Sequence, residues 1–299
     1  MHTTRVLALT AAGALAIALT GCASTASPTA TATTSTTELT ALLPQSIQDS
    51  GVLRLGNSAP YPPFSIINDD STHTGLDIEL GDALGAALGV QVEWSFQQWD
   101  QLQTSLDADR FDAIISGSSD RTDDHDTVWF VDYLHNGPAL IMPAEAADEA
   151  GITTQTDLCG MRISREFNST QFDEYLDAFN QESCIDAGLE SMVMVDASES
   201  AVNFTNIQSG RADAALEPAV NAGYRAQVLE PDTWAVIGGP IHDTMNAIQV
   251  PREDTELRDA LVAAFAQLLE DGTYAAIAEG YGLGDLVPTQ PYVNLEPVS

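Results

Sequence analysis

Short apolar runs of β-branched residues alternate with amphipathic segments along most of the chain. In the first half, this pattern predicts strands at 52–55, 90–96, 111–116 and 139–142, with helices between them at 77–88 and 99–106. The longer helix has one apolar face, made of Leu76, Leu80, Leu84 and Leu88. Gly89 follows directly and is expected to end the helix. Strands that alternate with helices in this way are typical of a doubly wound sheet.

The same alternation starts again near residue 157. The second set of predicted strands covers 162–165, 192–195, 212–216, 234–237 and 247–250. The second set of predicted helices covers 170–179, 198–208, 220–229, 255–270 and 273–279. Two successive units of this kind predict an α/β protein with two doubly wound lobes.

The first 21 residues are expected to form a targeting segment. Arg5 is their only charge, and the apolar run at 6–20 is too short to span a membrane. The following Leu19-Thr20-Gly21-Cys22 resembles the lipobox of bacterial lipoproteins, which would make Cys22 the lipidated first residue of the mature chain. A plain secretory signal with a chance cysteine is the alternative. Residues 22–43 lack apolar periodicity and are predicted to be a flexible tether.

Charge is the composition feature that narrows the function most. The chain has 44 acidic residues against 10 basic ones, all of them Arg, for a formal net charge of −34. Such a surface repels nucleic acid and anionic lipid, so both are excluded as partners and a lipid on Cys22 would be the only membrane attachment. The acidity fits an exported protein with Arg-biased coding, or equally a high-salt habitat in which ions screen the self-repulsion.

Cysteine usage predicts one disulfide. If Cys22 carries lipid, Cys159 and Cys184 are left as an even pair in an oxidising compartment. A bridge between them would close a loop of about 25 residues and stabilise the fold by ~3 kcal/mol. The spacing does not fit a zinc site, and a buried pair of free thiols is the alternative.

The stretch 111–137 carries the most chemistry. Its strand runs into Ser116, Gly117 and Ser119, at the carboxyl end of a strand, where open α/β sheets bind ligands. Charged residues and then an aromatic block follow. An ordinary loop with a solvated acidic turn is the alternative.

The sequence FDAIISGSSDRTDDHDTVWFVDY in this stretch resembles the bacterial extracellular solute-binding proteins of family 3, the polar amino-acid receptors of ABC importers. The resemblance extends through most of the mature chain. It implies two lobes of the type II periplasmic-binding-protein fold, joined by crossings near 139–142 and 245–250, which close by hinge motion on a ligand between them. The first lobe would comprise 44–139 and 246–299, and the second 140–245.

The resemblance also implies the site. Tyr61 and Trp99 match the aromatic pair that sandwiches the ligand, and Gly117 and Ser119 match the Gly and hydroxyl residue whose N–H and O–H groups hold it. Asp77 is expected to order a helix start. The complete expected set is Ser58, Tyr61, Trp99, Ser116, Gly117, Ser119, Arg121, Ser169, Thr170 and Glu217.

The charged positions depart from the family pattern. The Arg that clamps a carboxylate aligns with Asp124, and Arg121 either replaces it or simply pairs with Asp124. The acid that holds an ammonium group aligns with Pro218, beside Glu217, while Ser58 stands for the acid of the first loop. The acids near the expected cleft are Asp120, Asp124, Glu166 and Glu217. They favour a cationic or neutral polar ligand, unless they point outward as part of a generally acidic surface.

The sequence therefore predicts a monomeric, lipid-anchored receptor outside the membrane that needs no cofactor. It would capture a small polar solute, an amino acid or related amine, and deliver it to a permease driven by a cytoplasmic ATPase. A periplasmic dehydratase-like enzyme with Glu217 as its proton-transfer group is a second reading, but few Arg residues could hold a carboxylate substrate and no nucleophile–base motif stands out. A ligand-binding sensor module is the third, ranked lower because no spanning segment follows Gly284.

Overall fold

Two β-sheets organise residues 35–166 and 170–298, the part of the chain that the computed structural model describes. The first sheet has the strand order β14-β13-β6-β12-β5-β1-β4 and the second β11-β7-β10-β8-β9. The first comprises β1 (Val52–Asn57), β4 (Gln91–Phe96), β5 (Ala113–Ile114), β6 (Val128–Asn136), β12 (Thr244–Pro251), β13 (Tyr292–Val293) and β14 (Glu296–Pro297). The second comprises β7 (Pro138–Pro143), β8 (Arg162–Glu166), β9 (Val193–Ala197), β10 (Ala214–Pro218) and β11 (Trp234–Ile237).

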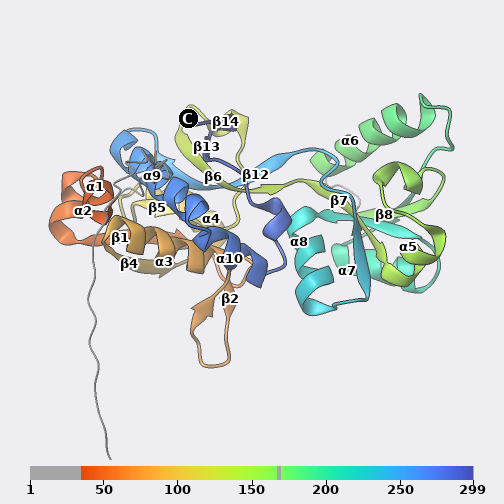
Figure 1. Cartoon of the computed structure of the whole chain (residues 1–299), viewed down its shortest axis with the longest axis horizontal. Coiled ribbons are helices and arrows are strands. Elements are labelled where there is room, and N and C mark those ends of the chain that lie inside the picture. Colours follow the sequence, from red (N-terminus) through yellow and green to blue (C-terminus); the bar gives the residue numbers. More distant parts are fainter. Residues whose placement is uncertain (1–34, 167–169, 299) are drawn as a thin grey trace, which may run out of the picture. The chain divides into compact units, whose positions relative to one another are not determined.

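Each sheet has its own helices (Figure 1). Around the first lie α1 (Thr36–Thr40), α2 (Gln45–Ser50), α3 (Leu76–Leu88), α4 (Trp99–Leu106), α9 (Thr255–Glu270) and α10 (Thr273–Gly280). Around the second lie α5 (Ala144–Ala150), α6 (Thr170–Phe179), α7 (Ser200–Gln208) and α8 (Ala219–Tyr224). A hairpin of β2 (Ile66–Ile67) and β3 (His73–Thr74) precedes α3. Helices α9 and α10 pack on α3 in the core of the first sheet.

The central strands of the two sheets have the same topology. β1 lies between β4 and β5 and is parallel to both, while β8 lies between β9 and β10 and is parallel to both. In the first sheet, the backbone N–H of Arg54 donates to Asp112 at 2.7 Å, and its guanidinium lies 2.5 Å from the same carboxylate. Arg162 and Asp213 repeat this contact in the second sheet, at 2.9 and 2.5 Å. The repeat confirms the expected α/β lobes and aligns corresponding strands in each.

The chain passes from the first sheet to the second at Gly137, between β6 and β7. Gly137 has φ +114°, and a Cβ there would lie 2.0 Å from the carbonyl oxygen of His242, so only glycine fits. The chain returns between β11 and β12. The predicted crossing at 139–142 lies in β7 of the second sheet, and the one at 245–250 lies in β12 of the first.

Two expectations about elements need correction, and one strand was missed. The predicted tether ends too late, because α1 already belongs to the fold and both Leu39 and Leu43 are buried. The strand expected at 111–116 is only β5, and the nine-residue β6 was not predicted as a strand. Seven of the nine β6 residues are buried, so the strand shows no alternation of apolar and polar positions.

The predicted disulfide between Cys159 and Cys184 is present, with 25 residues of sequence separation. It connects the residue after η2 (Gln155–Leu158) to the π-helical turn η3 (Asn180–Ile185), on the core of the second sheet. Ser169, Cys22, the predicted signal segment and most of the predicted tether lie outside the described residues. Within the described ranges, no helix combines the length and hydrophobicity needed to cross a bilayer.

Candidate functional site

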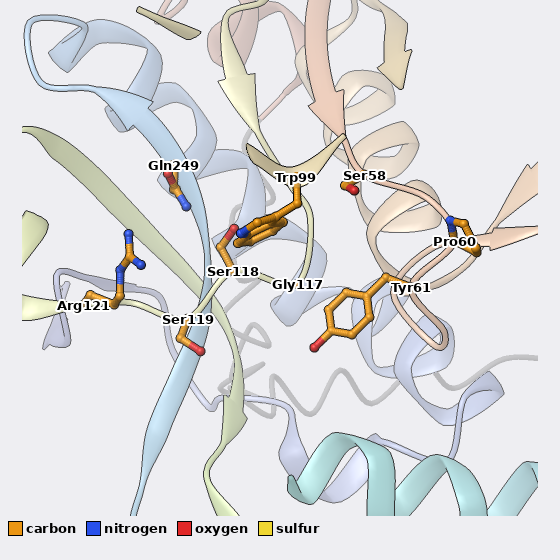
Figure 2. Close-up of a pocket in the computed structure, with 9 residues that line it drawn as sticks. All are labelled: Ser58, Pro60, Tyr61, Trp99, Gly117, Ser118, Ser119, Arg121 and Gln249. Carbon is orange, nitrogen blue, oxygen red and sulfur yellow. The ribbon is translucent and has the colours of Figure 1, made fainter. Parts of the chain in front are cut away.

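A pocket of about 490 Å³ opens on the first lobe, at the carboxyl ends of its central strands (Figure 2). Its lining comes from the loops after β1 and β5, the start of α4 and strand β12. The lining residues are Ser58, Pro60, Tyr61, Trp99, Gly117, Ser118, Ser119, Arg121 and Gln249. Six of the ten residues expected at the site are therefore gathered here: Ser58, Tyr61, Trp99, Gly117, Ser119 and Arg121.

Two aromatic rings form the apolar part of this pocket. Tyr61 is 42% exposed and stacks on Phe64, with the ring centroids 5.1 Å apart. Trp99, the first residue of α4, is 54% exposed. Figure 2 shows both rings beside the segment 117–119. Exposed aromatic faces of this size are available to stack on a ligand or to contact a cation.

The polar corner after β5, defined here as residues 116–119, is held from several sides. The buried Ser116 accepts the backbone N–H of Ser58 through its Oγ at 2.9 Å, so it fixes the pocket wall from behind. Gly117 has φ +62°, and a Cβ there would lie 2.7 Å from the Tyr61 ring. Glycine is thus required for both the conformation and the close approach.

Asp77 anchors this corner from the core. It is buried in the first turn of α3 and accepts the N–H of Gly117 and the O–H of Tyr133, each at 2.7 Å. Burial raises the pKa of Asp77 to about 7. The resemblance implied that the N–H of Gly117 grips the ligand. In this structure Asp77 occupies that N–H, so Gly117 shapes the pocket with its backbone conformation.

Arg121 lies at the pocket and pairs with Asp124, its Nη2 2.5 Å from the carboxylate Oδ2. Its side chain is 67% exposed. An ion pair this exposed stabilises the fold by less than about 1 kcal/mol. Arg121 can therefore exchange Asp124 for a ligand carboxylate at little cost.

None of the four acids expected around the cleft lines the pocket. Asp120 is buried and lies 2.5 Å from Nε2 of His125. Glu217 is 3% exposed at the end of β10, where it accepts from Ser200 Oγ at 2.9 Å and from Asn203 Nδ2 at 3.0 Å. Burial raises the pKa of Glu217. Asp124 is held by Arg121 and Glu166 is exposed, so the acids do not make this pocket acidic.

Sequence reasoning missed three lining residues: Pro60, Ser118 and Gln249. Gln249 was detectable in principle, because it is one polar residue within an apolar predicted strand and is buried in the structure. Thr170 is the first residue of α6, away from this pocket's lining. Across the described ranges, no three His, Cys, Asp or Glu side chains converge as metal ligands.

Comparison with known proteins gives the same picture. An arginine-binding protein of Corynebacterium glutamicum is 23% identical over 263 residues, covering 88% of this chain and 84% of the relative. A histidine-binding periplasmic protein of Escherichia coli is 29% identical over 255 residues, covering 83% of this chain and 91% of the relative. The fold is shared with the crystal structure of a polar amino acid ABC uptake transporter substrate-binding protein from Streptococcus thermophilus. The TM-score is 0.68 at 21% identity, and the match covers 82% of this chain and 90% of the other.

The family profile of the bacterial extracellular solute-binding proteins, family 3, matches residues 53–284. This span includes every residue of the pocket, the whole second sheet, and the first sheet except Val52 and the short strands β13 and β14. The chain belongs to the bacterial extracellular solute-binding proteins of family 3.

Proposed function

We propose that this protein is the extracytoplasmic substrate-binding component of an ABC importer and captures an amino acid or related amine. The observation that carries the proposal is the pocket on the first lobe, which presents two exposed aromatic rings beside a corner of serines. The buried Oγ of Ser118 has no hydrogen-bond partner among the described residues. A ligand group would satisfy it, since unpaired buried polar atoms are rare and costly.

The ligand class follows from three features of the pocket. The rings of Tyr61 and Trp99 attract cationic or flat apolar groups. Arg121 is exposed and weakly paired, so it can hold a carboxylate. The net charge of −34 draws cations toward the molecule. An α-amino acid with a cationic side chain fits all three, and the relatives described above are named as binders of arginine and histidine.

The finer parts of the proposal rest on the resemblance. Cys22 would carry a lipid after removal of residues 1–21, and the monomer would deliver its ligand to a permease and its ATPase. The second lobe, 140–245, would contribute the Ser169-Thr170 helix start and Glu217 when it closes on the first lobe, 44–139 and 246–299. A binding role rather than an enzymatic one is supported by the relatives described above, which are named as binding proteins.

A thermal-shift panel tests this proposal on the chain from residue 35 onward. It would include L-arginine, L-lysine, L-histidine, L-glutamate, putrescine and glycine betaine, at low and high salt. A ligand at 100 times its Kd stabilises by about 2.7 kcal/mol, which moves the melting temperature clearly. We expect the largest shift with a cationic amino acid and none with L-glutamate. A shift only with putrescine or betaine would contradict the role of Arg121, and no shift with any compound would contradict the receptor function.

A further inference from the structure

The polar corner after β5 pairs with strand β12 through antiparallel backbone hydrogen bonds. The N–H of Asp120 donates to the carbonyl of Met245, and the N–H of Ala247 donates to the carbonyl of Ser118, both at 2.8 Å. Ser119 and Asn246 form an isolated antiparallel bridge between these two contacts. At the same place, the register between β12 and β6 shifts in a β-bulge between Asn246 and Ala247. The extra residue lies on β6, where Tyr133 is left unpaired between Leu134 and Asp132.

Asn246 connects the pocket corner to the end of β6, next to the crossing at Gly137. Its side chain is buried, and its Nδ2 donates to the carbonyl of Gly117 at 2.8 Å. Its Oδ1 accepts from Nδ2 of Asn136, the last residue of β6, at 2.9 Å. The two amides therefore connect the corner beside the ligand pocket to the point where the chain leaves the first sheet.

Asn136 continues the connection to helix α8. Its Oδ1 accepts the backbone N–H of Val220 at 3.4 Å, and the carbonyl of the next residue, Gly137, accepts the N–H of Ala219 at 2.8 Å. Ala219 and Val220 are the first two residues of α8, which follows β10 of the second sheet directly. An unbroken line of hydrogen bonds thus runs from Gly117 through Asn246 and Asn136 to α8.

We propose that Asn246 and Asn136 are positioning residues that couple ligand occupancy of the pocket to the position of α8. The inference deepens the proposed receptor function and rests on it for the ligand. A ligand that touches Ser119 or displaces the 117–119 backbone moves the Gly117 carbonyl, to which Asn246 is bonded. Because Asn246 and Asn136 are buried, neither amide can exchange its protein partner for water without cost, so the displacement passes to the first turn of α8.

Isosteric substitutions can break one link at a time. Asn246→Asp removes the donor to Gly117 but keeps an acceptor for Asn136, and Asn136→Asp removes the donor to Asn246 but keeps an acceptor for Val220. Asn246→Ala removes the same donor without adding a buried charge. Asn206→Asp is the matched control, since Asn206 is a buried asparagine of α7 whose side chain bonds to Ser164 and Arg211.

The first readout is amide hydrogen exchange at Val220 in the ligand-free protein, under conditions where each variant is folded. We expect Asn246→Asp and Asn246→Ala to speed this exchange about tenfold, in the range usual for coupled sites. Asn206→Asp should leave it unchanged. The second readout is the Kd for L-arginine, which should rise about tenfold in Asn246→Asp and in Asn136→Asp. The double variant should show little further increase, because both substitutions interrupt the same series of hydrogen bonds.

Unchanged exchange at Val220 in both Asn246 variants would overturn the inference, as would fully additive effects of the two Asp substitutions on exchange. These outcomes are separable from failure of the proposed function. If the unsubstituted protein does not bind L-arginine, the proposed ligand class fails. The exchange at Val220 still decides whether the hydrogen bonds of Asn246 and Asn136 connect the pocket corner to α8.

Discussion

The corner after β5 and the end of β10 at Glu217 occupy equivalent places in two sheets of the same central topology, but their polar groups differ in exposure and in hydrogen bonding. The first corner, residues 116–119, exposes Ser119 to the pocket and leaves Ser118 Oγ without a partner in the described chain. In the second, Glu217 is buried under Ser200 and Asn203.

Behind the second corner, the polar side chains satisfy one another. Ser164 Oγ donates to Asn203 Oδ1 at 2.8 Å and accepts from Asn206 Nδ2 at 2.9 Å, and Asn203 in turn donates to Glu217. A buried network with its partners in place rigidifies the structure around it, whereas open hydroxyls beside exposed rings are free for a ligand. The difference supports the proposal that the first corner contacts the ligand, whereas the polar network behind the second corner stabilises its own lobe.

The largest expected effect is on the stability of the second lobe. Replacing both Cys159 and Cys184 by Ser should lower the free energy of unfolding by ~3 kcal/mol, because the bridge closes a loop of 25 residues. Urea unfolding measures it. The control is Cys22→Ser, which should leave stability unchanged. A double variant as stable as the parent would show that the second lobe does not depend on its disulfide.

The next effect sharpens the role of the first corner. Trp99→Leu should weaken binding of the best ligand from the thermal-shift panel about tenfold, through loss of an aromatic face, and should barely change the melting temperature of the ligand-free protein. Titration calorimetry measures the Kd. Phe96→Leu is the matched control, since Phe96 is exposed nearby in sequence but lies outside the pocket lining. Equal losses in both variants would argue against Trp99 as a ligand contact.

A pH effect comes from the carboxyl groups behind the first corner. Burial, and then the negative charge of Asp120, raises the pKa of Asp132 to about 8. The folded protein therefore binds a proton that the unfolded chain has already lost above pH ~4, so this contribution to stability is present at low pH and is lost as pH rises through about 8. One proton changes the free energy of unfolding by at most about 1.4 kcal/mol per pH unit.

Asp132→Asn should flatten that decline, and its Oδ1 can still accept the N–H of Leu295 that Asp132 accepts at 2.9 Å. Urea unfolding from pH 5 to pH 9 measures the slope. The exposed Asp123, in the helical turn before β6, provides a control with the same charge change, and Asp123→Asn should keep the parent slope. Identical slopes in all three proteins would place the pH dependence elsewhere.

Most helices and strands could be predicted from the sequence because each has one apolar face and one polar face. The stripe of Leu80 and Leu84 in α3 and the helix at 99–106 are examples. Strand β6 escaped prediction because both of its faces are covered, which removes alternation. The hairpin of β2 and β3 has only two residues per strand, too few to show a period.

Sequence reasoning named pocket-lining residues where they are close in sequence to a strand end, and it missed contacts between distant parts of the chain. Tyr61, Trp99, Ser119 and Arg121 follow recognisable elements and reach the same pocket. The charges of Asp120 and Glu217 were visible, but their orientation depends on His125, Ser200 and Asn203, and such pairings cannot be read from spacing. Gln249 and Asn246 reach the pocket corner from β12, more than 120 residues away from it.

The most direct test of the division between the two corners pairs two small changes. Ser119→Ala removes an exposed pocket hydroxyl, and Ser164→Ala removes a buried hydroxyl with two partners. Melting temperature and ligand Kd are measured for both. We expect Ser119→Ala to weaken binding roughly threefold to tenfold at unchanged stability, and Ser164→Ala to cost about 1 kcal/mol of stability at unchanged Kd. The reverse pattern, with binding lost through Ser164 and stability through Ser119, would contradict the account.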